Sequence, residues 1–248
     1  MLCKLSITLV VISTALLNLY SMVDGASLGK KHGNHFLGSN IHYTVSEEIQ
    51  GSNNAQSFYE ITESEENRLT RVKVSSNGVQ KDKIYDNGLG VFYNVGQDGQ
   101  CRVAMADPDI LGRDPEVYFH FNNLFLLDYD YDYIGKTKLE DRSGLPVMEW
   151  KTAKRNVDFE GRRVDKLVVH QYYPETARSE DAIFNPTSIL RTVISIYEAN
   201  SSGQGYTLAE TIKRDKMSYE IVENAYDSHD YFTLKDCKNI ISDKKINH

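Results

Sequence analysis

The sequence has no basic run and, after Leu19, no long hydrophobic run. Lysine and arginine number 28 against 35 acidic residues, which gives a formal net charge of −7 and a pI of about 5.5. Because recognition of phosphates needs clustered positive charge, we expect no nucleic-acid partner. No segment after Leu19 has the roughly 20 apolar residues of a membrane-spanning helix, so we expect no membrane span there.

Signatures of catalysis are also missing. The chain has no Gly-x-Ser-x-Gly, no His-Glu-x-x-His and no glycine-rich phosphate loop, which are motifs that place a nucleophile, a zinc ion or a nucleotide. Asp128, Asp130 and Asp132 alternate like calcium ligands. A calcium loop, however, needs glycine where Tyr133 stands and glutamate where Leu139 stands. We predict a protein that is not an enzyme, without cofactor or metal, and a solvated strand face for the aspartates; calcium is the alternative.

Residues 1–25 have the composition of a secretory signal peptide. Lys4 supplies a positive start, Leu5 to Leu19 is apolar, and Val23-Asp24-Gly25 offers a cleavage site before Ala26. A membrane anchor is the alternative, but the apolar run is short and is diluted by serine and threonine. We therefore expect a secreted, extracellular protein.

Cysteine is scarce, with three in the whole chain. Cys3 would leave with the signal peptide, so the mature chain would keep Cys101 and Cys237. Two cysteines far apart in sequence, in an oxidising compartment, predict one disulfide. The alternative is a pair of unpaired buried thiols.

One acceptor sequence for N-glycosylation is present, at Asn200-Ser201-Ser202. Asn185-Pro186-Thr187 fails because proline occupies its middle position. We predict glycosylation of Asn200, in a surface loop.

From Ile41 onward, strand-length runs of β-branched and aromatic residues alternate with turn signals. Asn77-Gly78, Asn87-Gly88 and the Asp-Gly pair within Gly96 to Gln100 follow one another at intervals of roughly ten residues, which predicts an antiparallel meander. Asp114-Pro115-Glu116 resembles the start of one short helix. The later strand runs are Tyr133–Lys138, Pro146–Ala153, Leu167–Tyr173, Ile189–Glu198 and Leu208–Met217. We expect one antiparallel domain of about nine to eleven strands over residues 41–240, after a flexible arm (26–40) and before a C-terminal tail (241–248).

The stretch from Leu124 to Trp150 combines a two-faced strand with the single tryptophan of the chain. Aspartates 128 to 132 alternate with tyrosines 129 to 133, which is the period of a strand whose faces differ. A lone tryptophan on an alternating strand usually anchors the core. We predict that Trp150 is buried beside Tyr133–Gly135.

The order of three short motifs resembles the LolA-like domain of secreted invertebrate proteins. Tyr133-Ile134-Gly135 is followed by Gly144-Leu145-Pro146 and then Trp150, and Asp230 to Cys237 closes the domain. In that family a Tyr-Val-Gly element, an Arg-Gly-Ile-Pro element leading to tryptophan, and a terminal Phe-Asp-Val-x-x-Cys recur. This chain departs from the pattern, because Ser143 is inserted, no cysteine follows the proline, and Thr-Leu-Lys-Asp precedes Cys237.

The resemblance, which covers residues 41–240, implies a mainly β fold. It would be a single antiparallel, strongly curved sheet or half-open β-barrel around an apolar cavity. One or two short helices or loops would act as a lid, and a signal helix would precede the domain. Bacterial relatives of the fold carry the acyl chains of lipoproteins. The family brings no catalytic residues and no ligand contacts that transfer by position, so the ligand-binding residues stay unknown.

Aromatic residues give the remaining functional clue. Fifteen of the 16 tyrosines follow the expected signal peptide, and tyrosine suits the rim of a ligand pocket as well as ordinary cross-strand packing. One hypothesis is a carrier or binder of a hydrophobic small molecule or acyl chain. The alternative is a non-catalytic protein-interaction, matrix or venom component with unknown protein partners. Alternate apolar positions would line the cavity, sampled from both strand faces by Phe92, Val103, Met148, Val169, Ile194 and Ile196.

Overall fold

The computed structural model describes residues 30–31, 40–51, 54–64, 67–95, 100–105, 119–175, 188–200, 205–222, 232 and 237. Its elements are β1 (Lys30–Lys31), β2 (Asn40–Gly51), β3 (Ala55–Ser64), β4 (Leu69–Ser76), β5 (Val79–Asp86), β6 (Val91–Val95), β7 (Cys101–Met105), α3 (Phe121–Leu124), β8 (Tyr131–Leu139), η1 (Glu140–Arg142), β9 (Leu145–Phe159), β10 (Arg162–Pro174), β11 (Arg191–Ala199) and β12 (Tyr206–Ile221).

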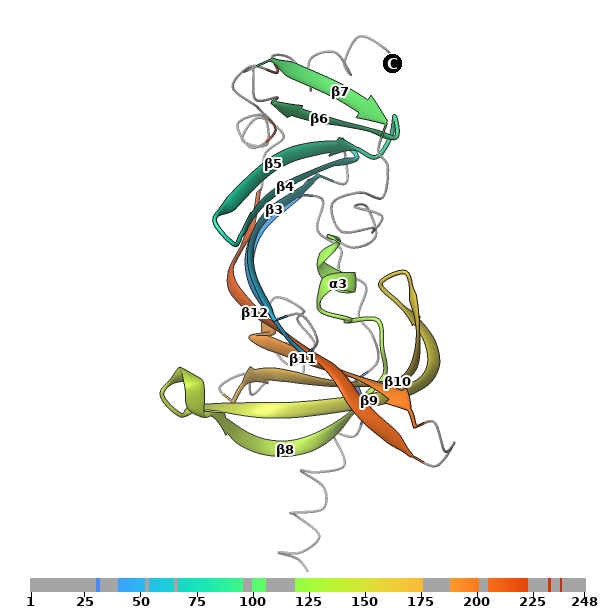
Figure 1. Cartoon of the computed structure of the whole chain (residues 1–248). Helices are drawn as coiled ribbons and strands as arrows, with labels where there is room; N and C mark the ends of the chain where they lie inside the picture. The colour runs from blue at the N-terminus through green and yellow to red at the C-terminus, as the bar shows by residue number, and fades with distance from the viewer. Residues whose placement is uncertain are drawn as a thin grey trace, which may run out of the picture.

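All twelve described strands belong to one antiparallel sheet. Their order is β1-β8-β9-β10-β11-β12-β2-β3-β4-β5-β6-β7, with β1 and β7 at the edges, so the sheet does not close on itself. Figure 1 shows that the sheet is strongly curved and that α3 lies within the curve. The predicted mainly β fold, a single curved antiparallel sheet with very few helices, is confirmed. The two-residue β1 raises the strand number above the expected range because it is too short to produce a sequence pattern.

The first half of the sheet is the expected meander, in which β2 to β7 lie side by side in chain order. Asn77 and Gly78 both take positive φ values, 51° and 77°, as a two-residue hairpin turn between β4 and β5 requires. The loop at Asn87-Gly88 is longer than predicted. It runs from Asn87 to Gly90, because Asp86 Oδ1 accepts hydrogen bonds from the N–H groups of Gly88 (3.0 Å) and Leu89 (2.9 Å).

The second half, β8 to β12, joins the meander where β12 pairs with β2. β9 and β10 form a long hairpin whose two-residue turn is Glu160-Gly161, with φ values of 50° and 77°. Both strands therefore extend beyond the runs predicted at Pro146–Ala153 and Leu167–Tyr173. Glutamate is an unusual residue for a left-handed turn position, so the local residues do not indicate a tight turn there.

The main core lies on the concave face of the sheet. Its buried members come from β2 to β5, from β8 to β12 and from the segment around α3. Trp150 is fully buried, and its ring lies 5.2 Å from that of Tyr133, so the predicted placement of the tryptophan is confirmed. Asp128, Asp130 and Asp132 are all exposed, although the strand begins only at Tyr131.

A smaller core lies on the opposite, convex face. It is formed by Leu69 and Ile84 with Phe232 and Cys237 from the C-terminal region. Cys237 is joined to Cys101 of β7 by a disulfide, with a Cα–Cα distance of 5.0 Å. The predicted pairing of these two cysteines is confirmed, and it ties residues 136 positions apart to one end of the sheet.

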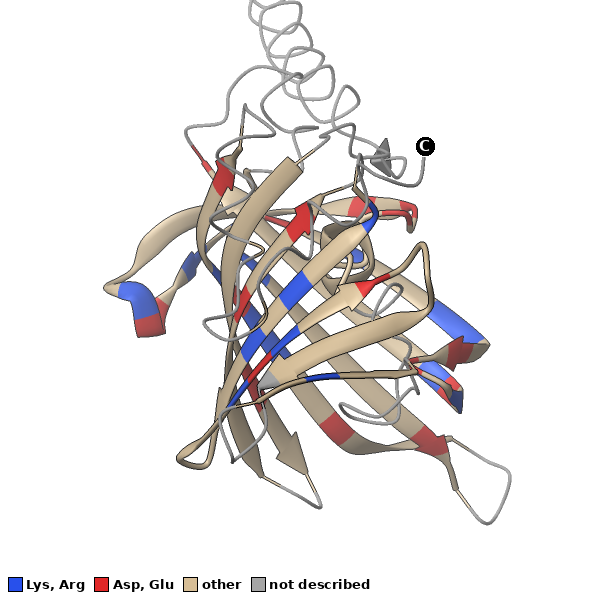
Figure 2. Ribbon diagram, turned by 90° about the horizontal axis from the view of Figure 1, so that it is seen from above, with Lys and Arg blue, Asp and Glu red and all other residues tan. Residues whose placement is uncertain are grey.

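Acidic and basic residues are interspersed along the strands (Figure 2). No helix within the described part of the chain is both long and apolar enough to cross a membrane. Several predicted segments lie outside the described residues: the signal peptide, the C-terminal tail, most of the arm over 26–40, and the helix start at Asp114-Pro115-Glu116. Within the arm, Lys30–Lys31 pair with β8.

Candidate functional site: the concave face of the sheet

Register determines which side chains share the concave face. Tyr43, Val45 and Glu47 of β2 alternate with outward-facing residues, and in β3 their paired neighbours include Ile61 and Tyr59. Across the junction with β12, the concave positions are occupied by Ile212 and Arg214, followed by Ile194 in β11 and Val169 in β10. The concave face is therefore apolar and aromatic, with a few polar side chains set among the apolar ones.

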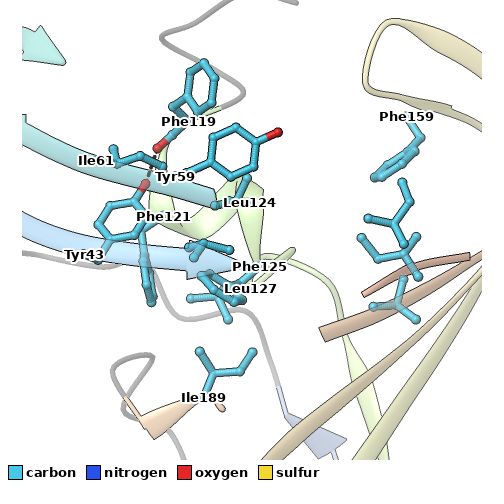
Figure 3. Close-up of a cluster of buried hydrophobic side chains, with 14 of the residues drawn as sticks. Tyr43, Tyr59, Ile61, Phe119, Phe121, Leu124, Phe125, Leu127, Phe159 and Ile189 are labelled. Carbon is cyan, nitrogen blue, oxygen red and sulfur yellow. Dashed lines mark hydrogen bonds between the residues drawn. The ribbon is translucent and has the colours of Figure 1, made fainter. Parts of the chain in front are cut away.

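Residues 119–127, which we call the covering segment, lie against this face. Phe119, Phe121, Leu124, Phe125 and Leu127 are all at most 1% exposed. The Phe121 ring packs 5.0 Å from the Tyr43 ring and 4.8 Å from the Phe125 ring. Figure 3 shows this cluster between the strands of β2 and β3 on one side and Phe159 on the other.

Polar side chains of the sheet hold the backbone at the start of the covering segment. The Tyr43 hydroxyl lies within hydrogen-bonding distance of the Phe119 carbonyl oxygen, and 2.8 Å from Glu63 Oε1. The same carboxylate accepts the N–H of Phe121 at 3.0 Å. His120 caps α3, because its Nδ1 accepts the N–H of Asn122 at 3.3 Å. These bonds satisfy backbone groups that a four-residue helix cannot pair by itself.

The end of the covering segment is held in the same way. Gln171 Nε2 donates to the Phe125 carbonyl at 2.7 Å, and the Tyr131 hydroxyl donates to the Leu126 carbonyl at 2.8 Å. Gln171 is itself oriented by the Tyr173 hydroxyl, which donates to its Oε1 at 3.0 Å. The concave face therefore binds the backbone of the covering segment as well as its side chains.

Arg214 is the most deeply buried charge at this site, with no exposed surface. Its Nε donates to Glu47 Oε2 at 2.7 Å, one terminal nitrogen donates to the Leu124 carbonyl at 2.8 Å, and the other pairs with Glu160. Glu47 also accepts the Tyr59 hydroxyl at 2.9 Å. This group, which we call the Arg214 cluster, links β2, β12, the covering segment and the tip of the β9–β10 hairpin.

Burial keeps the tyrosines of the site neutral. It raises the pKa of Tyr59, Tyr131 and Tyr173 above the ordinary tyrosine value, and the neighbouring Glu47 carboxylate raises that of Tyr59 further. All three hydroxyls are therefore hydrogen-bond donors throughout the physiological pH range.

Five of the six sampled lining residues belong to or pack against the concave cluster. Met148, Val169, Ile194 and Ile196 are buried there, and Phe92 packs against the cluster from β6. Val103 is 58% exposed, so its inclusion was wrong. It lies in the edge strand β7, opposite Tyr93, which packs in the convex core.

Sequence reasoning missed Arg214, Glu47 and Gln171. A signal was present, because Glu47 follows Tyr43 and Val45 at the apolar positions of one strand, and Arg214 follows Ile212 in the same way. A charge at a core position of a strand is unusual enough to indicate a buried ion pair. Asn200 directly follows β11, and its backbone N–H donates to the Gly205 carbonyl at 3.1 Å. The rest of its sequon lies outside the described residues.

No family model matches the sequence, and no curated protein sequence matches it. Among solved structures, the chain is similar to a LolA superfamily protein from Nitrosomonas europaea, with 10% sequence identity and a TM-score of 0.36, over 81% of this chain and 92% of that chain. The resemblance to the LolA-like domains of secreted invertebrate proteins stays a prediction.

Proposed function

We propose that this protein is a secreted, non-catalytic binding protein whose concave sheet face takes a hydrophobic, lipid-like ligand. One observation carries the proposal: nine strands present apolar and aromatic side chains to a single concave face. Within the described residues, a short segment rather than a second sheet covers that face. Local opening of a short segment costs less free energy than global unfolding of the sheet, so such a segment can give way to a ligand.

Ligand binding on this face requires the covering segment to move, because its aromatic rings occupy the interior. An acyl chain that replaced Phe121 or Phe125 would recover the same burial of apolar sheet surface, worth roughly 25 cal/mol per Å². The backbone of the segment would then lose its bonds to Tyr43, Gln171 and Arg214. Affinity would reflect the difference between these two contributions.

Two further features support secretion. Residues 1–25 have the composition of a signal peptide, and the Cys101–Cys237 disulfide is typical of oxidising compartments. Expression in secreting eukaryotic cells should give a mature chain that begins at Ala26, and N-terminal sequencing of the medium fraction checks this.

The chain offers its own optical probe for the binding test. Trp150 is the single tryptophan and lies in the concave core. A polyene fatty acid that absorbs tryptophan emission should bind the delipidated protein one-to-one, quench Trp150 by energy transfer and raise the melting temperature by mass action. Lipid extraction of the freshly secreted protein, followed by mass spectrometry, should recover a bound lipid.

Control variants separate the concave face from exposed apolar residues elsewhere. Val103 and Leu208 are 58% and 52% exposed, so Val103→Ser and Leu208→Ser should leave probe affinity unchanged. If both variants abolish binding, or if the wild-type protein neither binds the probe nor carries lipid, the binding proposal fails.

A non-catalytic interaction, matrix or venom component is the second candidate. One observation favours it: the covering segment fills the concave face completely. Its apolar side chains are buried, and its backbone carbonyls accept hydrogen bonds from the sheet. In that case the segment is a permanent part of the core, and the fold serves as a rigid scaffold. Absence of any bound or bindable lipid in the two assays above would select this candidate.

A further inference from the structure

The strand β12 carries an irregularity beside the covering segment. Its register with β2 shifts between Lys216 and Ser218, and Met217 is the extra residue, 58% exposed. A β-bulge of this kind re-aims the side chains around it. Lys216 pairs with Val45, and Tyr219 pairs with Tyr43. Because Val45 and Tyr43 both belong to the concave core, Lys216 and Tyr219 face the concave side as well.

Lys216 therefore brings an ammonium group to an apolar face. Its Nζ lies 5.8 Å from the centre of the Tyr219 ring, which packs 5.1 Å from the ring of Phe121 in the covering segment. The side chain is only partly exposed. Burial lowers the pKa of Lys216 to about 8, which is the direction expected when a cation is withdrawn from water.

Other charges face this place from the neighbouring elements. Arg214 and Glu47 lie on the same face, two residues along β12 and β2, and bind each other at 2.7 Å. The carboxylate of Glu63 in β3 accepts the Phe121 N–H, so this negative charge contacts the covering segment. Burial raises the pKa of Tyr219 above the ordinary tyrosine value, so its hydroxyl is neutral at physiological pH.

We propose that Lys216 binds the anionic headgroup of a single-chain amphiphile whose hydrocarbon chain lies on the concave face, in the space that the covering segment leaves when it moves. The inference rests on the proposed hydrophobic-ligand function and names the ligand class. An ammonium in partly dry surroundings gains more from an anion than one in open water, because the effective dielectric constant is lower. Carboxylate and phosphate headgroups share this chemistry, and the test distinguishes them.

The experiment uses the full mature protein and three probes of equal chain length: myristate, tetradecyl phosphate and 1-tetradecanol, each below its aggregation concentration. Displacement of the polyene probe from the wild-type protein should rank at least one anion about ten-fold or more above the alcohol. Whichever anion binds more tightly identifies the headgroup.

Lys216→Met should lower the affinity for that anion by about ten-fold and change the affinity for 1-tetradecanol less than two-fold, while Lys216→Arg should retain the preference. Lys166 is a matched control. Its ammonium also lies near a tyrosine ring, 5.0 Å from the centre of the Tyr197 ring. Lys166 faces outward, however, because its neighbour Leu167 occupies the concave core. Lys166→Met should bind all three probes like the wild type.

The pH profile gives a second readout that does not depend on a variant's folding. Anion affinity of the wild type should fall above pH 8 as Lys216 loses its proton, and alcohol affinity should not. Equal binding of anions and alcohol, or an unchanged preference in Lys216→Met, overturns the headgroup assignment and leaves the hydrophobic site standing. Failure of all three probes to bind overturns both proposals.

Discussion

Replacing Arg214 with methionine tests whether the Arg214 cluster holds the covering segment and the β9–β10 hairpin on the sheet. Methionine keeps much of the buried apolar volume but removes the charge that faces Glu47 and Glu160. Breaking a buried ion pair by deleting one partner costs about 3–5 kcal/mol, because the remaining charge stays buried without compensation. The Leu124 carbonyl would also lose a donor.

A matched control comes from Arg162 of β10, which pairs with Glu210 but is 47% exposed at its side chain, whereas that of Arg214 is 0% exposed. Exposed ion pairs contribute about 0.2–1 kcal/mol. Arg162→Met should therefore lower the free energy of unfolding by about 1 kcal/mol or less, several times less than Arg214→Met. Urea unfolding followed by Trp150 fluorescence measures both, and linear extrapolation gives the free energies.

A rescue variant identifies the cause of the loss. If uncompensated carboxylates are responsible, adding Glu47→Gln and Glu160→Gln to Arg214→Met should restore at least half of the lost stability, because neutral buried groups need no counter-charge. An Arg214→Met variant no less stable than Arg162→Met would refute the reasoning. So would a rescue variant that is less stable than Arg214→Met alone.

Four further predictions test separate parts of the molecule. Opening the disulfide by replacing Cys101 and Cys237 with serine should lower stability by up to about 4–5 kcal/mol; recovery of both cysteines as free thiols in peptide maps of the native secreted protein would contradict the bridge. Trp150→Ala should lower the free energy of unfolding by about 3–5 kcal/mol. Trp150→Phe should lower it much less, because Nε1 has no hydrogen-bond partner within the described structure. Equal losses for the two variants in urea unfolding would count against the packing argument. Asn200→Gln should remove a glycan and increase gel mobility of the secreted protein, and identical mobility before and after deglycosylation would exclude occupancy. Lys216 has a pKa of about 8 in the folded protein, against 10.5 for the ordinary side chain. Between these pH values the unfolded chain binds more protons than the folded one, so the stability of the wild type should rise relative to that of Lys216→Met from pH 8 to 10. A difference in melting temperature that stays constant with pH would disprove the shift.

The β-strands and the meander follow from local patterns, which explains why the sequence predicted them. Side-chain alternation with a period of two and the Asn77-Gly78 turn act over a few residues, so they can be recognised without tertiary contacts. Trp150 and the cysteine pair were also predictable. A lone large aromatic residue is usually buried, and two cysteines expected in an oxidising compartment usually form a disulfide. The tight turn at Glu160 was not predictable, because a tertiary contact with Arg214 accompanies a backbone conformation that glutamate rarely adopts.

What only the tertiary structure decided is which residues meet on the concave face. Glu47 and Arg214 are separated by 167 positions, and Gln171 and Phe125 by 46, yet each pair is in direct contact. These contacts depend on sheet order and curvature, which join β12 to β2 and turn one face inward. Alternation within a strand shows that its two faces differ, but it does not show which face is concave. That choice depends on how twelve strands twist together, and so the covering segment, the Arg214 cluster and the inward position of Lys216 became visible only in the folded chain.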